Sequence, residues 1–281
     1  NKTVLDEAGI EVKDGVTIDE FVELSKEIQE KTGLKTNVGY NHETLPEYWL
    51  RAKDQVFFEE GKLGANGWED IETIFALEEQ GIREGWHIDP SVFTEITIGA
   101  AEQDPIIYGS SPENMSWCAF AYSNQLAAIQ EAAPEGMELG ITTWPSDNLE
   151  KSNYLKPSQF FAVTTDCKNP DEAVKVLDYI TNSVECNKVL LGERGVPISE
   201  SVAEAITPML DETNQKIVEY VNNVVTPTCS TINPAAPNGA NEVYDLLKNL
   251  EEQVLYGQIS AEDAAKQLFE EGNAYMAAGQ E

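Results

Sequence analysis

Apolar residues recur at helical spacing along most of the chain. In the stretch GVTIDEFVELSKEIQEKTG, Phe21, Leu24 and Ile28 fall on one face of a helix. Thr17 and Glu20 have the spacing of a capping box, and the final glycine is a residue that commonly ends a helix. The pattern therefore predicts a helix with both ends marked by the sequence.

Similar patterns predict further helices. Pro46 is expected in the first turn of an aromatic-rich helix, and Ser123 is expected to cap the helix that follows it. Asn169 is expected to cap a helix with a buried stripe of Val174, Leu177 and Ile180. The expected helical segments are 44–58, 68–81, 123–133, 169–182, 212–224, 240–257 and a last helix opened by Ser260 and Asp263.

Two apolar, β-branched stretches predict strands. They are MELGITTWP (137–145) and SQFFAVTTD (158–166), and turn residues bound both of them. The polar connection SDNLEKSNYLKP between them is expected to mark a lobe boundary. Short strands among many helices favour an α/β fold with layered elements.

The charge of the chain excludes some partners. The 281 residues include 18 Lys and Arg against 50 Asp and Glu, and the net charge of −32 repels nucleic acids and anionic membrane surfaces. No run approaches the ~18 apolar residues of a membrane span. The four cysteines lack the close pair spacing of zinc sites and there are two histidines, so neither a metal nor another cofactor is expected.

Motifs of catalysis are absent from the sequence. It contains no GxSxG, GxxxxGK[ST], HExxH or GxGxxG pattern. Paired carboxylates could still serve glycoside hydrolysis, because some of the 50 acidic residues will lie at a suitable separation. A catalytic residue is not predicted, and a glycan-active enzyme or accessory domain stays as an alternative.

Three loops combine aromatic and amide side chains near the start of a helix. They are GYNHETLPEYW, SWCAFAYSNQL and INPAAPNGANEVY. Sugar rings pack their apolar faces on Trp and Tyr, while their hydroxyls need polar partners. The loops therefore suit a carbohydrate, although core aromatics with polar neighbours would give the same pattern.

Three longer segments carry a resemblance to a known family. The opening NKTVLDEAGIEVKDGVTIDEFVELSKEI, the segment NPDEAVKVLDYITNSVECNKVLLGERGVPIS and the terminal GQISAEDAAKQLFEEGNAYM resemble the family 1 extracellular solute-binding proteins of bacterial ABC transporters, which include maltose-binding protein. The resemblance covers nearly the whole chain. It implies a type II periplasmic-binding-protein-like fold of two lobes, with a carbohydrate bound between them.

The family pattern also implies a division of the chain. Residues 1–153 and 207–281 are expected to build the second lobe, while 154–206 belong to the first. Family members have roughly 100 to 130 further residues before this point, which hold a lipoprotein signal and most of the first lobe. We therefore expect this chain to begin at the second lobe and to carry a partial first lobe, and a full-length form to be monomeric.

Two stacking positions follow from the resemblance. Trp117 matches an aromatic of the second lobe that stacks on a sugar, and Tyr244 matches a second such position near the start of the penultimate helix. Asn124 and Gln125 could hydrogen-bond sugar hydroxyls or cap their own helix. Arg194 is interpreted as a turn residue paired with a local carboxylate.

The loop before residue 50 supplies the remaining candidates. Tyr48 and Trp49 fall where the family places another aromatic, and Glu47 where it places a carboxylate. Packing roles are an equal alternative for each, and His42 could equally be a solvent-exposed histidine. The upstream loop candidates are Tyr40, Asn41 and His42.

The resemblance implies a function without catalysis. The expected protein is a component of an ABC importer that delivers an oligosaccharide to the transmembrane permease subunits, at the cell surface or in the periplasm. A carrier of peptides or polyamines is a further alternative, and the scarcity of histidine argues against a metal carrier.

Overall fold

The chain forms two compact units. The computed structural model describes residues 1–109, 111–157, 159–192 and 195–280. Residues Asn1–Tyr154 and Thr228–Glu281 form the larger unit, and Leu155–Pro227 form the smaller one. The smaller unit thus extends beyond residue 206, where the sequence prediction placed a boundary, while the assignment of the units to lobes stays a prediction.

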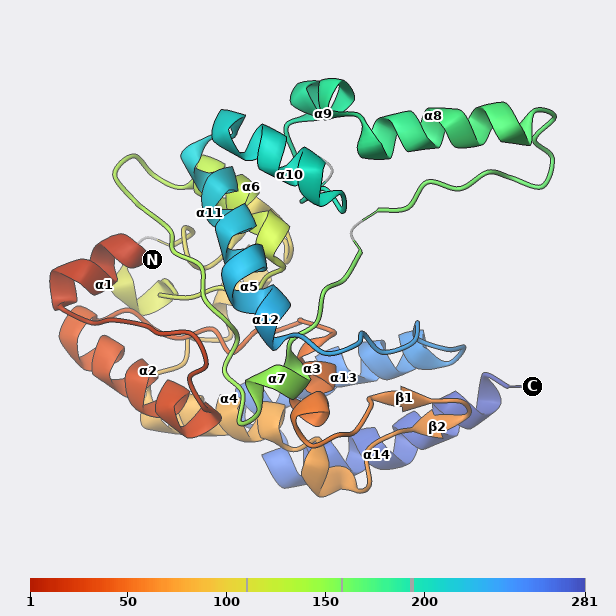
Figure 1. The fold of residues 1–281 in the computed structure, drawn as a ribbon. Helices are drawn as coiled ribbons and strands as arrows, with labels where there is room; N and C mark the ends of the chain where they lie inside the picture. Colours follow the sequence, from red (N-terminus) through yellow and green to blue (C-terminus); the bar gives the residue numbers. More distant parts are fainter. Residues whose placement is uncertain (110, 158, 193–194, 281) are drawn as a thin grey trace. The chain divides into compact units, whose positions relative to one another are not determined.

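The larger unit is built mainly from helices (Figure 1). Its one short hairpin pairs β1 with β2 in antiparallel register, with Phe58 opposite Leu63. Its elements are α1 (Lys2–Ala8), α2 (Ile18–Thr32), α3 (Leu45–Ala52), β1 (Phe58–Glu59), β2 (Lys62–Leu63), η1 (Trp68–Asp70), α4 (Thr73–Glu84), α5 (Val92–Glu95), η2 (Ala101–Gln103), η3 (Pro112–Asn114), η4 (Ser123–Gln125), α6 (Leu126–Ala132), α7 (Leu149–Ser152), α13 (Ala240–Leu255) and α14 (Ala261–Ala278).

The helix ends that the sequence marks most clearly are confirmed. Thr17 accepts a hydrogen bond from the Glu20 backbone N–H, and the Glu20 side chain accepts one from the Thr17 N–H. Gly33 ends α2 with a left-handed backbone, at φ 78°. Ser260 caps α14 by accepting from the Asp263 N–H. Each cap satisfies backbone groups that a helix end leaves without partners.

Helices α13 and α14 provide the centre of the core. They pack side by side in the larger unit, and both pack against α4 (Figure 1). Val243, Leu247, Leu250 and Val254 repeat at intervals of three and four residues on α13, and each is at most 2% exposed. This spacing places them on one face of the helix, where their burial drives the packing.

In the smaller unit, the apolar stripe of Val174, Leu177 and Ile180 was predicted to be buried, and this prediction is wrong. Its elements are α8 (Pro170–Asn182), α9 (Val184–Leu190), α10 (Glu200–Ile206), η5 (Thr207–Met209), α11 (Glu212–Tyr220) and the π-helical turn η6 (Val221–Val225), followed by α12 (Thr226–Thr228), which crosses its boundary. Helix α8 buries none of its residues, Val174 is 56% exposed, and Leu177 and Ile180 are half-buried. Among the described residues, no segment covers this face of α8. Asn169 occupies the cap position without a side-chain capping bond.

The two predicted strands and the Ser123 cap are also wrong. Neither 137–145 nor the described part of 158–166 forms a strand. A strand needs a neighbouring backbone, whereas the first segment is held partly by a side chain: Asp14 Oδ1 accepts from the Thr143 N–H at 3.1 Å. Ser123 lies inside η4, where the Gln125 side chain instead accepts from the Tyr122 N–H at 2.8 Å.

A pair of carboxyl groups is buried between α4 and α13. Glu78 and Glu251 are each 0% exposed, and among the described residues none of their four carboxyl oxygens has a hydrogen-bond partner. Burial raises the pKa of Glu78, and the Glu251 charge raises it further. Burial raises the pKa of Glu251 to about 8, against the opposing effects of the nearby Asn41 backbone and of Lys248. Both groups are therefore held in their neutral form over most of the acidic and neutral range.

The buried pair predicts how stability depends on pH. In the unfolded chain Glu251 ionises with the ordinary glutamate pKa of 4.5, whereas the folded state holds the proton up to about 8, so the free energy of unfolding falls as pH rises between these values. Glu251→Gln removes that loss. We expect the variant to be more stable than the parent by about 4 kcal/mol at pH 8 and nearly equal at pH 4.5, as measured by urea unfolding.

Glu242→Gln is the matched control, because Glu242 is an exposed residue of the same helix. It should leave the pH dependence unchanged. An unaltered slope in Glu251→Gln would contradict the assignment.

Candidate functional site

Two of the predicted ligand-binding tryptophans belong to the core. Trp117 is 5% exposed, its ring centroid lies 6.0 Å from that of Phe21, and its Nε1–H donates to Thr36 Oγ1 at 2.8 Å. Trp49 is 3% exposed and its Nε1–H donates to the Pro145 carbonyl at 2.8 Å. Both indoles have the partner that a buried tryptophan needs, and neither presents a free ring face in this structure.

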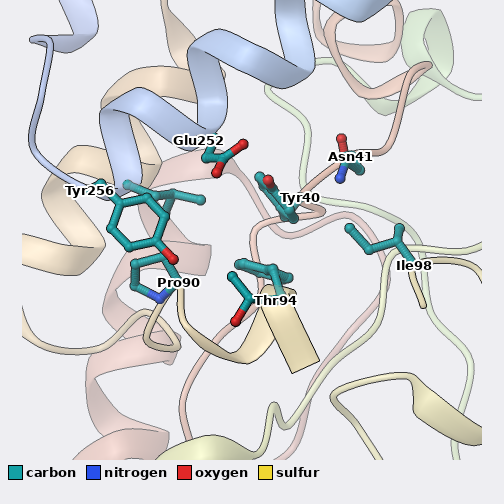
Figure 2. A pocket seen from close by; sticks show the side chains of 9 residues that line it. Tyr40, Asn41, Pro90, Thr94, Ile98, Glu252 and Tyr256 are labelled. Atoms are coloured by element: carbon teal, nitrogen blue, oxygen red, sulfur yellow. The ribbon is translucent and has the colours of Figure 1, made fainter. Parts of the chain in front are cut away.

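The loop before α3 directs its side chains to two different places. Asn41 has a left-handed backbone, at φ 60°. Tyr40 stacks on Phe93, with ring centroids 3.9 Å apart. His42 instead packs edge-on against Trp144, with centroids 4.4 Å apart. Tyr40 and Asn41 line a pocket (Figure 2), whereas His42 joins an aromatic cluster on the same unit.

We call this cluster the aromatic surface. Its members are half-buried side chains brought together from loops that are far apart in the sequence. The ring centroids of His42 and Tyr122 lie 5.7 Å apart. The rings of Tyr48 and Phe120 contact Trp144, with centroid distances of 5.2 and 5.4 Å. The aromatic surface comprises His42, Tyr122, Trp144, Tyr154 and, at its border, Tyr244.

A carboxylate lies among these rings. Glu47 lies in the first turn of α3, and, in addition to their burial, its charge raises the pKa of both Tyr154 and Tyr244. Burial raises the pKa of Tyr154, and the neighbouring Tyr122 raises it further. Burial likewise raises the pKa of Tyr244, and the charges of Glu47 and Glu43 add to the shift. The phenols therefore stay protonated, so the aromatic surface presents hydroxyl donors beside a carboxylate acceptor.

Tyr122 connects the surface to its supporting loop. Its hydroxyl donates to Thr44 Oγ1 at 3.4 Å, and Thr44 Oγ1 lies 3.1 Å from His42 Nδ1. These contacts limit the rotation of the two rings. A surface with fixed rings binds a flat apolar face with less loss of conformational freedom.

Some of the residues predicted to bind a ligand lie together in this surface, and their role stays a prediction. The structure brings together His42, Glu47 and Tyr244 from the predicted set, with Tyr48 beneath them. Asn124 is exposed in η4, and Arg194 lies outside the described residues. The residues that sequence reasoning missed are Tyr122, Trp144 and Tyr154. Tyr122 lies within the aromatic loop SWCAFAYSNQL. The sequence predicts a strand at Trp144 and a polar connection at Tyr154.

Arg51 fixes the two chain segments that lead to the smaller unit. We call the two places where the chain passes between the units, at residues 154–155 and 227–228, the crossings. Arg51 is 5% exposed, and before the first crossing its guanidinium donates to the Ser152 carbonyl at 3.1 Å. After the return crossing it donates to Ser230 Oγ at 2.6 Å, the Thr231 carbonyl at 3.0 Å and Asn233 Oδ1 at 2.5 Å. One side chain on α3 therefore holds both segments together.

The same guanidinium supports the aromatic surface. It lies 5.0 Å from the ring centroid of Tyr154, within the range of a cation–π contact. Burial lowers the pKa of Arg51 and Glu47 opposes the shift, but an arginine keeps its charge at neutral pH. Tyr154 also forms a parallel bridge with Ser230, which ties the surface to the second segment.

The aromatic surface can form stacking contacts and hydrogen bonds. Among the described residues no three histidine, cysteine or acidic side chains are placed to hold a metal ion, and no described helix is both long and apolar enough to cross a membrane. Fixed rings with a carboxylate and phenol hydroxyls can stack on a polar ring and hydrogen-bond its substituents.

Solved structures share this arrangement of the chain. An extracellular solute-binding protein family 1 member from Alicyclobacillus acidocaldarius superimposes with a TM-score of 0.83 at 21% identity, over 98% of this chain and 68% of that one. A periplasmic oligogalacturonide-binding protein from Yersinia enterocolitica, in complex with saturated digalacturonic acid, gives 0.76 at 18% identity over 100% and 70%. The chain has the fold of the solute-binding proteins.

That fold confirms the predicted fold class, a two-lobed α/β fold of the periplasmic-binding-protein type. A de novo designed esterase also superimposes on the solute-binding fold, with a TM-score of 0.77 at 16% identity over 100% of this chain and 70% of that one. No family model matches the sequence. One fold can host many functions, so the side chains of the site decide what the protein binds.

Replacement of Arg51 tests whether it holds the crossings. Arg51→Lys keeps the charge but cannot reach acceptors on both segments, and the acceptors it leaves are buried. We expect a loss of about 2–4 kcal/mol in unfolding free energy, together with faster amide hydrogen exchange at Ser230, whose N–H donates to the Asn153 carbonyl.

Arg83→Lys provides the control, because Arg83 is an exposed arginine of α4 whose side chain is 65% exposed. It should change neither quantity by a measurable amount. Unchanged exchange at Ser230 in Arg51→Lys would show that the backbone contacts hold the segments without the guanidinium.

Proposed function

We propose that the chain is the sugar-binding component of a bacterial importer and that its ligand is a neutral oligosaccharide. The observation that carries this proposal is the aromatic surface, where Tyr122, Trp144 and Tyr154 lie around the Glu47 carboxylate. Sugars present apolar C–H faces to rings and hydroxyl donors to carboxylates. Similar solved structures include a sugar-binding protein, which supports the same ligand class.

The charges around the site favour a neutral sugar over an acidic one. The charges of Glu47 and Glu43 both act on Tyr244, and Lys248, one turn further along α13, pairs with Glu43 at 2.7 Å. Arg51 uses its donors on backbone and side-chain oxygens of the crossings. A uronate would therefore meet carboxylates without an available cation, whereas neutral hydroxyls would find acceptors.

The position of the surface supports a closing mechanism. Tyr154 is the last residue of the larger unit before the chain passes to Leu155. A ligand that first stacks on this surface would be covered when a second lobe closes about the crossings. Closure would bury the sugar and create the form that a transmembrane permease recognises. In this proposal the protein acts outside the cytoplasmic membrane and performs no chemistry.

The first test is a titration with sugars. A ligand at about 100 times its Kd adds about 2.7 kcal/mol to the unfolding free energy, so thermal unfolding in a panel of neutral oligosaccharides should identify the cargo. Trp144→Ala and Tyr154→Phe separate stacking from hydrogen bonding. We expect about a tenfold weaker Kd for the former, measured by calorimetry, and a smaller change for the latter.

Trp68→Ala is the matched control, because Trp68 packs beside Lys266 and takes no part in the aromatic surface. It should bind the sugar as the parent does. Tighter binding of a digalacturonate than of any neutral sugar would refute the charge argument. Release of sugar products during the titration would favour the glycan-active alternative, and an absence of binding by every sugar would reject a carbohydrate ligand.

A further inference from the structure

A second concave site lies on the other side of the loop that carries His42. The pocket has a volume of about 210 Å³. Its walls come from the loop at Tyr40, the turn and helix around Pro90 and Phe93, and the end of α13 at Glu252 and Tyr256. Figure 2 shows the Tyr256 ring beside Pro90, with Glu252 and Tyr40 on the neighbouring wall. None of its walls includes a residue of the aromatic surface.

Of the described residues, Glu252 is the one charged residue that lines this pocket, beside the hydroxyls of Tyr40 and Tyr256. Asn41 Oδ1 is buried and has no hydrogen-bond partner among the described residues. Glu252 is exposed to the pocket and forms no ion pair within the described part of the chain. The hydroxyl of Thr94 is already engaged, because it donates to the Ser91 carbonyl at 2.7 Å. The Asn41 oxygen is enclosed and does not face the pocket, so the exposed Glu252 carboxylate is the acceptor that a hydrogen-bond donor entering the pocket can reach.

Aromatic rings enclose the same space. Tyr40 and Phe93 stack on one another, and Tyr256 lies on the opposite element. Neither lysine nor arginine lines the pocket. Ring faces attract cations through their quadrupole, and Glu252 adds a full negative charge at the rim. Burial and the Glu252 charge both raise the pKa of Tyr40, so its phenol remains uncharged and does not alter this balance.

We propose that this pocket binds a small organic cation with an apolar body, such as an aryl or alkyl ammonium. The ammonium group lies against the Glu252 carboxylate, and the apolar body packs on Tyr40, Phe93 and Tyr256. The net charge of −32 raises the local concentration of such cations. The proposal for this pocket is independent of the proposed sugar function.

The volume of the pocket limits the size of the ligand. A cavity of roughly 150 Å³ accommodates benzene. The pocket here, at about 210 Å³, has room for one aromatic ring and a short ammonium arm. A disaccharide would not fit within it. Benzylammonium is therefore a suitable probe, and benzyl alcohol is its neutral counterpart of nearly equal shape.

The test compares the two probes on the intact chain by saturation-transfer and protein-observed NMR. We expect benzylammonium to bind saturably with a Kd on the order of 1 mM, at least tenfold more tightly than benzyl alcohol, and more weakly as salt is raised. Chemical-shift changes should centre on Tyr40 and Tyr256. Glu252→Gln should weaken the binding of benzylammonium about tenfold and leave that of benzyl alcohol unchanged.

Two further variants keep the outcome clear. Glu242→Gln removes an exposed carboxylate at the far end of the same helix and should not alter binding. Trp144→Ala changes the aromatic surface and should also leave benzylammonium binding intact, so failure of the sugar proposal would not affect this result. Equal binding of both probes, or equal losses in Glu252→Gln and Glu242→Gln, would overturn the proposal.

Discussion

The hydrogen bonds of Arg51 are the constraint on which the arrangement of the larger unit depends. Its guanidinium is buried, and oxygens of two segments far apart in the sequence accept its hydrogen bonds. A buried charge is tolerated only when it is fully hydrogen-bonded, so these oxygens must stay in place once the helix α3 has formed. The position of both crossings is therefore fixed by packing on α3, and Tyr154 is placed with them.

The two candidate sites of this acidic protein suit different kinds of ligand. The aromatic surface combines fixed rings with a carboxylate whose neighbours are protonated phenols, which suits hydroxylated ligands. The pocket near Tyr40 combines rings and aliphatic side chains with one exposed carboxylate, which suits a positive charge on an apolar body. Both sites contain tyrosines and a glutamate, and they differ in their other members: His42 and Trp144 in the first, Phe93, Ile98 and Leu255 in the second.

Local signals in the sequence were sufficient for the helices and insufficient for the site. The capping box at Thr17 and the apolar spacing of α13 predict their helices because both depend on neighbours within a few residues. Trp117 and Trp144 could not be distinguished in this way, since burial of a tryptophan depends on segments distant in sequence. The stripe of α8 failed for a related reason: amphipathic spacing indicates that a helix can bury one face, and the partner must come from elsewhere.

The left-handed residue Asn41 has a consequence for the sequences that this fold can accept. Its backbone turns the loop so that Tyr40 and His42 contribute to separate sites. Glycine, asparagine and aspartate adopt this conformation readily, while a β-branched residue is strained there by roughly 1–2 kcal/mol. A substitution at this position would therefore act on both sites at once, through the backbone rather than through a ligand contact.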